Sequence, residues 1–152
     1  MYILGIDPGK NGGLCILSTD INDVILLEKM PQTPTDLSNK LDGIRNDYWP
    51  IKCYLEKVGG MPGQGGAAMF NFGYNFGQLI QALTDYKIPH ELVTPQKWQT
   101  ATNCRGKSGE SKTAHKNRIK DTASRLHPLS KVTLWGADAV MIAEYGKQLN
   151  NK

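Results

Sequence analysis

The chain has 152 residues and a formal net charge of +4, and its hydrophobic fraction of 39% is ordinary for a globular protein. This length fits one domain that buries roughly two-thirds of its unfolded surface, so we expect a single domain over residues 1–152. No stretch approaches the roughly twenty apolar residues of a membrane span, and nothing at the start has the pattern of a signal peptide. Three widely spaced cysteines favour reduced thiols over a disulfide framework or a zinc site, so we expect a soluble, cytoplasmic protein.

The first apolar run, residues 1–6, predicts a buried strand that leads directly into Asp7. Residues 7–13 are rich in turn formers, and the apolar run at 14–18 predicts a second strand, which makes a hairpin with a carboxylate at its tip. A carboxylate at such a position needs a metal ion, a cation or backbone amides as its partner. The alternative is that Asp7 only stabilises the turn.

The next stretch repeats this layout. Residues 23–30 predict a third strand that completes an antiparallel meander, and residues 35–46 have the apolar spacing of a helix. Residues 51–58 predict another strand, with Glu56 near its end, and the glycine-rich stretch 59–66 follows. An apolar strand, an acid at its end and a flexible loop therefore occur twice.

Helices dominate the rest of the chain. Residues 67–83 predict a helix with an aromatic start, and Gly73 and Gly77 would let another backbone approach one face, such as that of a second subunit. Residues 90–93 predict the last strand, and Thr94 is the expected N-cap of a short helix that begins at Pro95, from which Trp98 packs onto the core. The other predicted elements are a flexible loop at 103–109 and helices at 111–126 and 136–145.

Charge is distributed unevenly along the chain. Residues 97–131 hold nine Lys and Arg against two acids, a net charge of +7, so the remainder carries −3. A basic block beside a slightly acidic body is typical of a protein that handles a polyanion. The alternative is a solvated helix face in a slightly basic protein.

Three acids share an unusual setting, since Asp7 and Glu56 end apolar strands and Asp138 begins an apolar helix. If the strand ends of a mixed sheet meet, the three converge, and they stay ionised together only with divalent cations between them. Oxygen ligands without His or Cys favour Mg²⁺ or Mn²⁺. Two such ions can activate a water and stabilise the leaving oxygen of a phosphodiester, so the set predicts a hydrolytic nuclease.

Three motifs, ILGIDPG around Asp7, YLEKV around Glu56 and GADAVMIAEYG around Asp138, together resemble the RuvC family of Holliday junction resolvases, particularly its short bacteriophage versions. The resemblance implies an α/β, RNase H-like fold with a mixed five-stranded sheet flanked by helices. It also implies a homodimer that nicks four-way and other branched DNA, with Mg²⁺ or Mn²⁺, two per active site, held by the three acids. For a phage protein the location would be the host cell cytoplasm.

One position departs from the family. A fourth ligand, Asp or His, usually stands three or four residues before the last Asp, where this chain has Leu134 and Trp135. Glu144 lies six residues after Asp138, out of phase with it, and is expected to be a solvated helix residue. The candidate replacements for the fourth ligand are Glu144, His115 and Asp121; otherwise one metal is held by fewer protein ligands and more water.

The DNA contacts are expected on both sides of the acids. Lysines beside the acids would neutralise phosphates, and Lys112 is predicted to be catalytic, with a plain surface role as the alternative. Exposed aromatic side chains at the start of helix 67–83 would stack on opened bases unless the core or the dimer interface claims them. The loop 59–66 would let a duplex approach closely, unless it is a disordered linker. The predicted DNA-binding residues are Lys57, Gly60, Gln64, Phe70, Phe72, Tyr74, Arg105, Lys107, Lys112 and Lys116.

Three other functions compete with a junction-cutting nuclease. An RNase H-like nuclease for RNA or hybrids would act through a single site, so dimerisation separates the two. An actin-like nucleotide-binding module needs two such domains around a cleft, and 152 residues supply one. A non-catalytic protein that binds branched DNA is favoured by the residues at positions 134 and 135.

Overall fold

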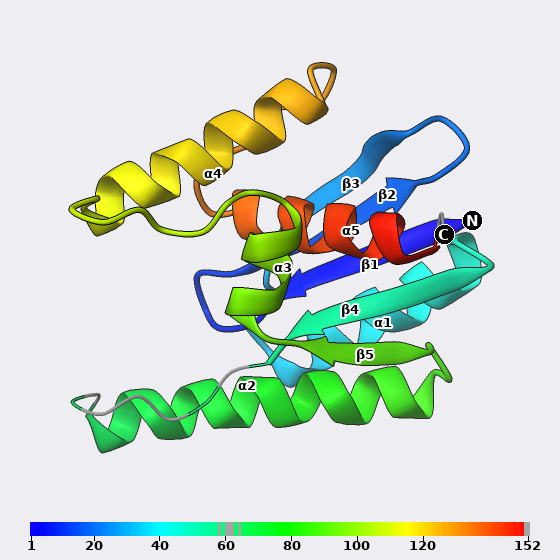
Figure 1. Ribbon diagram of the computed structural model, residues 1–152. Coiled ribbons are helices and arrows are strands. Elements are labelled where there is room, and N and C mark those ends of the chain that lie inside the picture. The colour runs from blue at the N-terminus through cyan, green and yellow to red at the C-terminus, as the bar shows by residue number, and fades with distance from the viewer. Residues whose placement is uncertain (58, 60–62, 64, 151–152) are drawn as a thin grey trace.

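The computed structural model describes residues 1–57, 59, 63 and 65–150. Within these residues, no helix is long and apolar enough to cross a membrane. The strands form one sheet in the order β3-β2-β1-β4-β5 (Figure 1). In chain order the elements are β1 (Tyr2–Asp7), β2 (Gly13–Ser18), β3 (Asp23–Lys29), α1 (Pro34–Asp47), β4 (Ile51–Glu56), α2 (Gly66–Asp85), β5 (His90–Val93), α3 (Pro95–Ala101), α4 (Lys112–Leu126) and α5 (Ala137–Asn150).

The sheet is mixed. β1, β2 and β3 pair antiparallel, which confirms the predicted meander, whereas β1 with β4 and β4 with β5 pair parallel. β1 is the central strand, and it reads as an unbroken apolar run because both of its faces are covered. The predicted α/β class with a mixed five-stranded sheet is confirmed.

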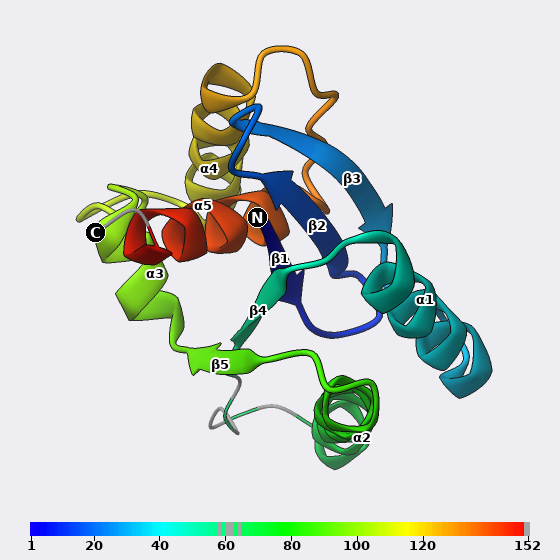
Figure 2. The same ribbon diagram turned by 90° about the vertical axis from the view of Figure 1, so that its right-hand side faces the viewer.

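Helices cover both faces of the sheet (Figure 2). Successive side chains of a strand point to opposite faces, so Ile3 joins the core under α5, α3 and α4, while Leu4 joins the core under α1 and α2. The central strands therefore have little freedom to move, and their ends are fixed points on which a site can be built.

Helix α5 lies directly against β1 because of a glycine. A Cβ atom at Gly5 would collide with the backbone carbonyl of Ala139, so only glycine allows this approach. At the other end of α5, a Cβ at Gly146 would collide with the ring of Tyr54 in β4. These two contacts set the height of α5 above the sheet and bring its first turn over the end of β1.

Most predicted boundaries agree with the structure to within a few residues. Helix α1 begins earlier than predicted, at Pro34, because Pro suits the first helical position and the Thr33 hydroxyl caps the helix by accepting a hydrogen bond from the Asp36 N–H at 3.1 Å. Strand β4 ends at Glu56 itself. The acid is therefore the last residue of the strand.

Candidate active site

Two of the predicted acids are neighbours because two strands are parallel. In the register between β1 and β4, Ile6 pairs with Leu55, so the next residues, Asp7 and Glu56, leave the sheet side by side at the same edge. Both side chains are partly exposed there. The separation of 49 positions along the sequence is closed by the parallel pairing alone.

The third acid reaches the same edge from above. Asp138 lies in the first turn of α5, next to Ala139, whose carbonyl rests on Gly5 of β1. Its charge acts on both Asp7 and Glu56. The structure therefore gathers the three predicted acids from β1, β4 and α5 at the carboxyl ends of the two central strands.

The three carboxylates disturb one another. Burial, followed by the negative charges of Asp138 and Glu56, raises the pKa of Asp7 to about 8. Burial also raises the pKa of Glu56 and that of Asp138. The Lys116 ammonium lowers all three pKa values but does not cancel the rise. Without a cation Asp7 therefore stays largely protonated at neutral pH, because the chain supplies too little positive charge for all three carboxylates to ionise together.

Trp98 orients one of the acids. Its indole ring is fully buried in α3, and its Nε1–H donates a 2.8 Å hydrogen bond to Oε1 of Glu56. This bond opposes the rise in the pKa of Glu56 that burial causes. The packing of Trp98 was predicted from the sequence and is confirmed. Its bond to Glu56 was missed, because nothing in the pattern links positions 42 apart.

The turn after Asp7 is tied to α2. The Gly9 N–H donates a 2.8 Å hydrogen bond to Oδ1 of Asn75, and the ring of Phe72 lies so close that a Cβ at Gly9 would come within 2.7 Å of it. Gly9 has φ of +102°, which favours glycine. The Phe72 ring is therefore used to hold this turn, which removes it from the group of freely accessible aromatic side chains.

The donor set suits a hard divalent cation. The three carboxylates match the preference of Mg²⁺ or Mn²⁺ for oxygen, and a divalent ion would relieve the repulsion that adds to burial in raising the pKa of Asp7. In the described part of the chain, no three His, Cys, Asp or Glu side chains already converge on one ion position. A shared ion would therefore require these side chains to move from their present positions.

The positions of the usual fourth ligand hold side chains that cannot bind a cation. Leu134 is 51% exposed, and the Trp135 ring packs over Gly13, with the Lys29 ammonium 5.8 Å from the ring centroid. Of the candidate replacements, His115 has a charge that acts on Asp138 and lowers its pKa.

Glu144, another candidate, is not the solvated residue that we expected. Its side chain is buried, its Oε1 lies 2.8 Å from Nε2 of His127, and it also pairs with Lys147. The other ring nitrogen of His127 faces Asp23 at 3.1 Å. Glu144 lies on a different side of α5 from Asp138, as its spacing suggested. It faces His127 and Lys147 inside the protein instead of solvent.

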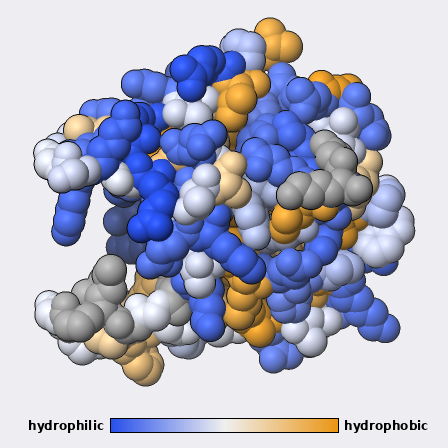
Figure 3. Space-filling view, viewed as in Figure 1, coloured by the Kyte–Doolittle hydropathy of each residue, from blue (hydrophilic) through white to orange (hydrophobic). Residues whose placement is uncertain are grey.

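Two projecting helix ends flank the acids. The N-terminal ends of α4 and α2 both extend beyond the arrowheads of β1 and β4 (Figure 1), and the space-filling surface is hollowed between them, on the left of Figure 3. The α4 side of this recess is strongly hydrophilic. The side chains of Arg105, Lys107, Lys112 and Lys116 are exposed on the segment that includes α4.

Lys116 is the lysine whose charge lowers the pKa of all three acids. Lys112, one helical turn earlier, begins α4 and is exposed, and its catalytic role stays a prediction. Lys57 is exposed directly after Glu56. Gly60 and Gln64, predicted to contact DNA, lie outside the described residues.

The start of α2 exposes aromatic rings. Phe70 is 72% exposed and Tyr74 is 56% exposed, and their rings are stacked with centroids 6.3 Å apart. Met69, beside them, is 39% exposed. These three side chains are more exposed than Phe72 on the same helix, which is half-buried. They therefore form an apolar surface that a partner can reach.

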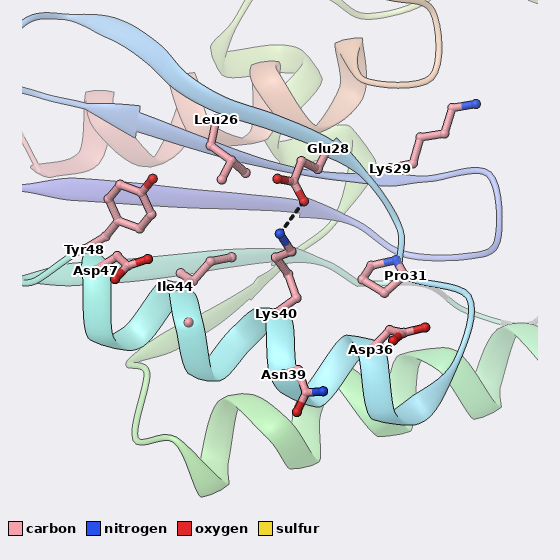
Figure 4. Close-up of a pocket in the computed structure, with 11 residues that line it drawn as sticks. Leu26, Glu28, Lys29, Pro31, Asp36, Asn39, Lys40, Ile44, Asp47 and Tyr48 are labelled. Atoms are coloured by element: carbon pink, nitrogen blue, oxygen red, sulfur yellow. Dashed lines mark ion pairs between the residues drawn. The ribbon is translucent and has the colours of Figure 1, made fainter.

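A hollow of about 510 Å³ between β3 and α1 is a separate feature (Figure 4). An ion pair of 2.6 Å between Glu28 and Lys40 spans it, and other acids and lysines line it together. Its lining includes none of the three gathered acids. Because its charges are mixed and partly paired, we assign the candidate site to the carboxylates at the strand ends.

The chain folds into a mixed five-stranded α/β sheet flanked by helices, and this arrangement is the RNase H-like fold. Neither a protein-family model nor a curated protein sequence matches the chain. Its fold is similar to that of Thermus thermophilus RuvC in complex with Holliday junction substrate, with a TM-score of 0.72 and 15% identity over 99% of this chain and 96% of that one. A further structure of Thermus thermophilus RuvC has a TM-score of 0.65 and 15% identity, covering 99% and 97%. The chain therefore has a RuvC-like fold.

Proposed function

We propose that the protein is a divalent-metal-dependent endonuclease that nicks four-way DNA, and other branched DNA of similar shape. The observation that carries the proposal is the gathering of Asp7, Glu56 and Asp138 at one edge of a RuvC-like sheet, where burial and mutual repulsion raise the pKa of Asp7 to about 8. Three acids that destabilise one another are expected where an external cation is bound.

The chain's own residues prepare this site. Asp7, Glu56 and Asp138 would hold Mg²⁺ or Mn²⁺, two ions in the complete site, and the bound metal would supply an activated water and charge stabilisation at the scissile phosphate. Trp98 keeps one oxygen of Glu56 engaged, which orients the other. The Lys116 ammonium lies where it can neutralise a phosphate oxygen next to the acids.

The two flanking helix ends give the recess two different chemistries. The basic side, formed by the segment that contains α4, suits the phosphates of a duplex arm. The aromatic side, with Phe70 and Tyr74 exposed on α2, suits bases that are unstacked at a branch point, where each stacked base contributes about 1–3 kcal/mol. A branched substrate offers both features close together, whereas a regular duplex offers only the first.

A homodimer completes the proposal, because paired nicks on a four-way substrate need two sites. Gly73 and Gly77 are exposed on α2, and a Cβ at either would have no heavy atom within 4 Å. The variants Gly73→Gln and Gly77→Gln are therefore compatible with the monomer fold. Sedimentation analysis should show a dimer for the original chain and a shift toward monomer for a variant whose new side chain enters the interface.

The decisive experiment compares labelled four-way DNA, linear duplex and RNA–DNA hybrid in Mg²⁺, Mn²⁺ or chelator. We expect symmetric nicks in the four-way substrate alone, only with metal, and none with Asp7→Asn or Glu56→Gln. Cleavage of the hybrid instead would identify a ribonuclease. Cleavage that persists in chelator would refute the metal-dependent mechanism.

A second candidate function is binding of branched DNA without cleavage. It is favoured by Leu134 and Trp135, which stand where the family has its fourth ligand. The Trp135 ring packs over Gly13, so this position supplies no oxygen or nitrogen ligand for a cation. Salt-sensitive binding of four-way DNA, with no nicks under any metal, would establish this function in place of the nuclease.

A further inference from the structure

The basic loop before α4 is held in place by side chains of α4. We had predicted a flexible segment at 103–109, but the Arg118 guanidinium donates to the Arg105 carbonyl at 2.6 Å, and Nε2 of His115 lies 2.7 Å from the Cys104 carbonyl. His115 and Arg118 are one helical turn apart and so face the loop together. The loop therefore has a defined shape, in correction of the prediction.

An acid completes this attachment. Glu110 receives two hydrogen bonds from Arg118, Nε to Oε1 at 2.7 Å and Nη2 to Oε2 at 2.9 Å. Its Oε2 also accepts the backbone N–H of Lys107 at 2.9 Å. Hydrogen bonding by Arg118, then by Lys107, lowers the pKa of Glu110 to about 2, so the pair is ionised at neutral pH. We call Glu110 and Arg118 the loop clamp.

The clamp pairs an acid with an arginine inside a surface that is otherwise basic. Glu110 is one of two acids among residues 97–131, and its side chain is only 11% exposed, whereas Arg105 and Lys107 are exposed. The Arg118 guanidinium bonds to Glu110 and to the Arg105 carbonyl, and its side chain is 24% exposed. The bidentate pair thus fixes the backbone that carries the two exposed cations.

We propose that Glu110 and Arg118 are positioning residues for DNA binding, which hold residues 103–110 so that Arg105 and Lys107 form a preformed phosphate-binding surface. This inference rests on the proposed function, since it names how the same recess grips its substrate. Cations on an ordered loop bind phosphates without the ordering cost that cations on a free loop would incur.

The proposal predicts an effect of unusual sign. Removing an acid from a surface that binds a polyanion normally strengthens binding, because one more positive charge is left over. If the clamp orders the loop, Glu110→Gln instead weakens binding of four-way DNA by about 3- to 10-fold, the range expected when one or two side chains lose their preorganisation. Asp121→Asn removes the same charge from the exposed surface of α4 and is the matched control, because the charge of Asp121 acts on none of the three gathered acids and so does not place it at the metal site.

A second variant separates charge from geometry. Arg118→Lys keeps the positive charge but cannot make the bidentate pair and the Arg105 carbonyl bond together, so it should also weaken binding about 3- to 10-fold. Because both residues act as one unit, the double variant Glu110→Gln/Arg118→Lys should lose little more than either single variant. Binding is measured by fluorescence anisotropy in chelator at one fixed salt concentration.

Hydrogen exchange tests the clamp without DNA. The Lys107 amide should exchange faster in Glu110→Gln and Arg118→Lys than in the original chain or in Asp121→Asn. Unchanged exchange, or binding by Glu110→Gln as tight as that of Asp121→Asn, would overturn the clamp. If the original chain does not bind four-way DNA at all, the proposed function fails, while the exchange data still decide whether Glu110 and Arg118 order the loop.

Discussion

Helix α5 carries two acids with opposite fates. Asp138, in its first turn, lies beside Asp7 and Glu56, and burial raises its pKa although Lys116 and His115 oppose the rise. Glu144, six residues later, is buried too, but pairing with His127 and Lys147 overcomes the effect of burial and lowers its pKa. The chain therefore balances the charge of Glu144 within the fold, whereas Lys116 and His115 balance that of Asp138 only in part.

This difference distinguishes a structural acid from a candidate functional one. An acid whose charge is balanced within the fold contributes to stability and has little capacity for an outside ligand. An acid held among other acids costs stability and is retained where something else supplies the positive charge. Burial alone would not have separated the two, since both acids are largely buried.

Of the changes to helix α5, the exchange of Asp138 for Asn should have the largest effect on nicking. Nicking should fall on the order of 10²- to 10³-fold, a loss typical of removing one group that stabilises the reacting charge. The free energy of unfolding without metal should stay the same or rise, because repulsion with Asp7 is relieved. Single-turnover cleavage and urea unfolding measure the two quantities. A strongly destabilised Asp138→Asn protein would contradict the comparison.

The complementary change, Glu144→Gln, should act on stability instead. It removes the carboxylate that pairs with Nε2 of His127 and with the Lys147 ammonium, while Asp23 still faces the other ring nitrogen. The free energy of unfolding should fall by about 3 kcal/mol. Mn²⁺ affinity of the folded protein, measured by calorimetric titration, should not change. Loss of Mn²⁺ binding at unchanged stability would show that Glu144 belongs to the metal site.

Trp98→Phe removes the hydrogen bond to Glu56 and keeps a buried aromatic ring, although a smaller one. We expect Mn²⁺ affinity to weaken about 10- to 100-fold, as is usual when a partner of a metal ligand is lost. The control is Trp49→Phe, which alters a 52% exposed ring stacked on Arg45 at 3.9 Å. Equal affinities in the two variants would show that the bond does not orient Glu56.

The last expected effect concerns the pH dependence of stability. Asp7 has a pKa of about 8 in the fold against 3.8 ordinarily, so between these values the folded state binds more protons than the unfolded state. The free energy of unfolding in chelator should therefore fall as pH rises from about 4 to about 8. Mg²⁺ should reduce this slope, and Asp7→Asn should flatten it. A stability that rises with pH across this range would refute the repulsive cluster.

The amino-acid sequence by itself determined the elements and the chemistry of the candidate site. Alternating and helical apolar patterns depend on local burial, so they located all five strands and the helices to within a few residues. The turn residues after Asp7, the acid that ends β4 and the acid that begins α5 were recognisable because each stands at an abrupt change from apolar to polar sequence. The mixed five-stranded sheet was expected from the resemblance of the three motifs to the RuvC family.

The tertiary structure alone decided which side chains meet. The bond from Trp98 to Glu56, the bond from Gly9 to Asn75 and the buried pairing of Glu144 join positions whose spacing carries no periodic signal. Such contacts depend on the height and rotation of packed helices, which Gly5 sets for α5 and which no local pattern encodes. For the same reason the ordered loop before α4 looked flexible in sequence, since the side chains that hold it come from the following helix.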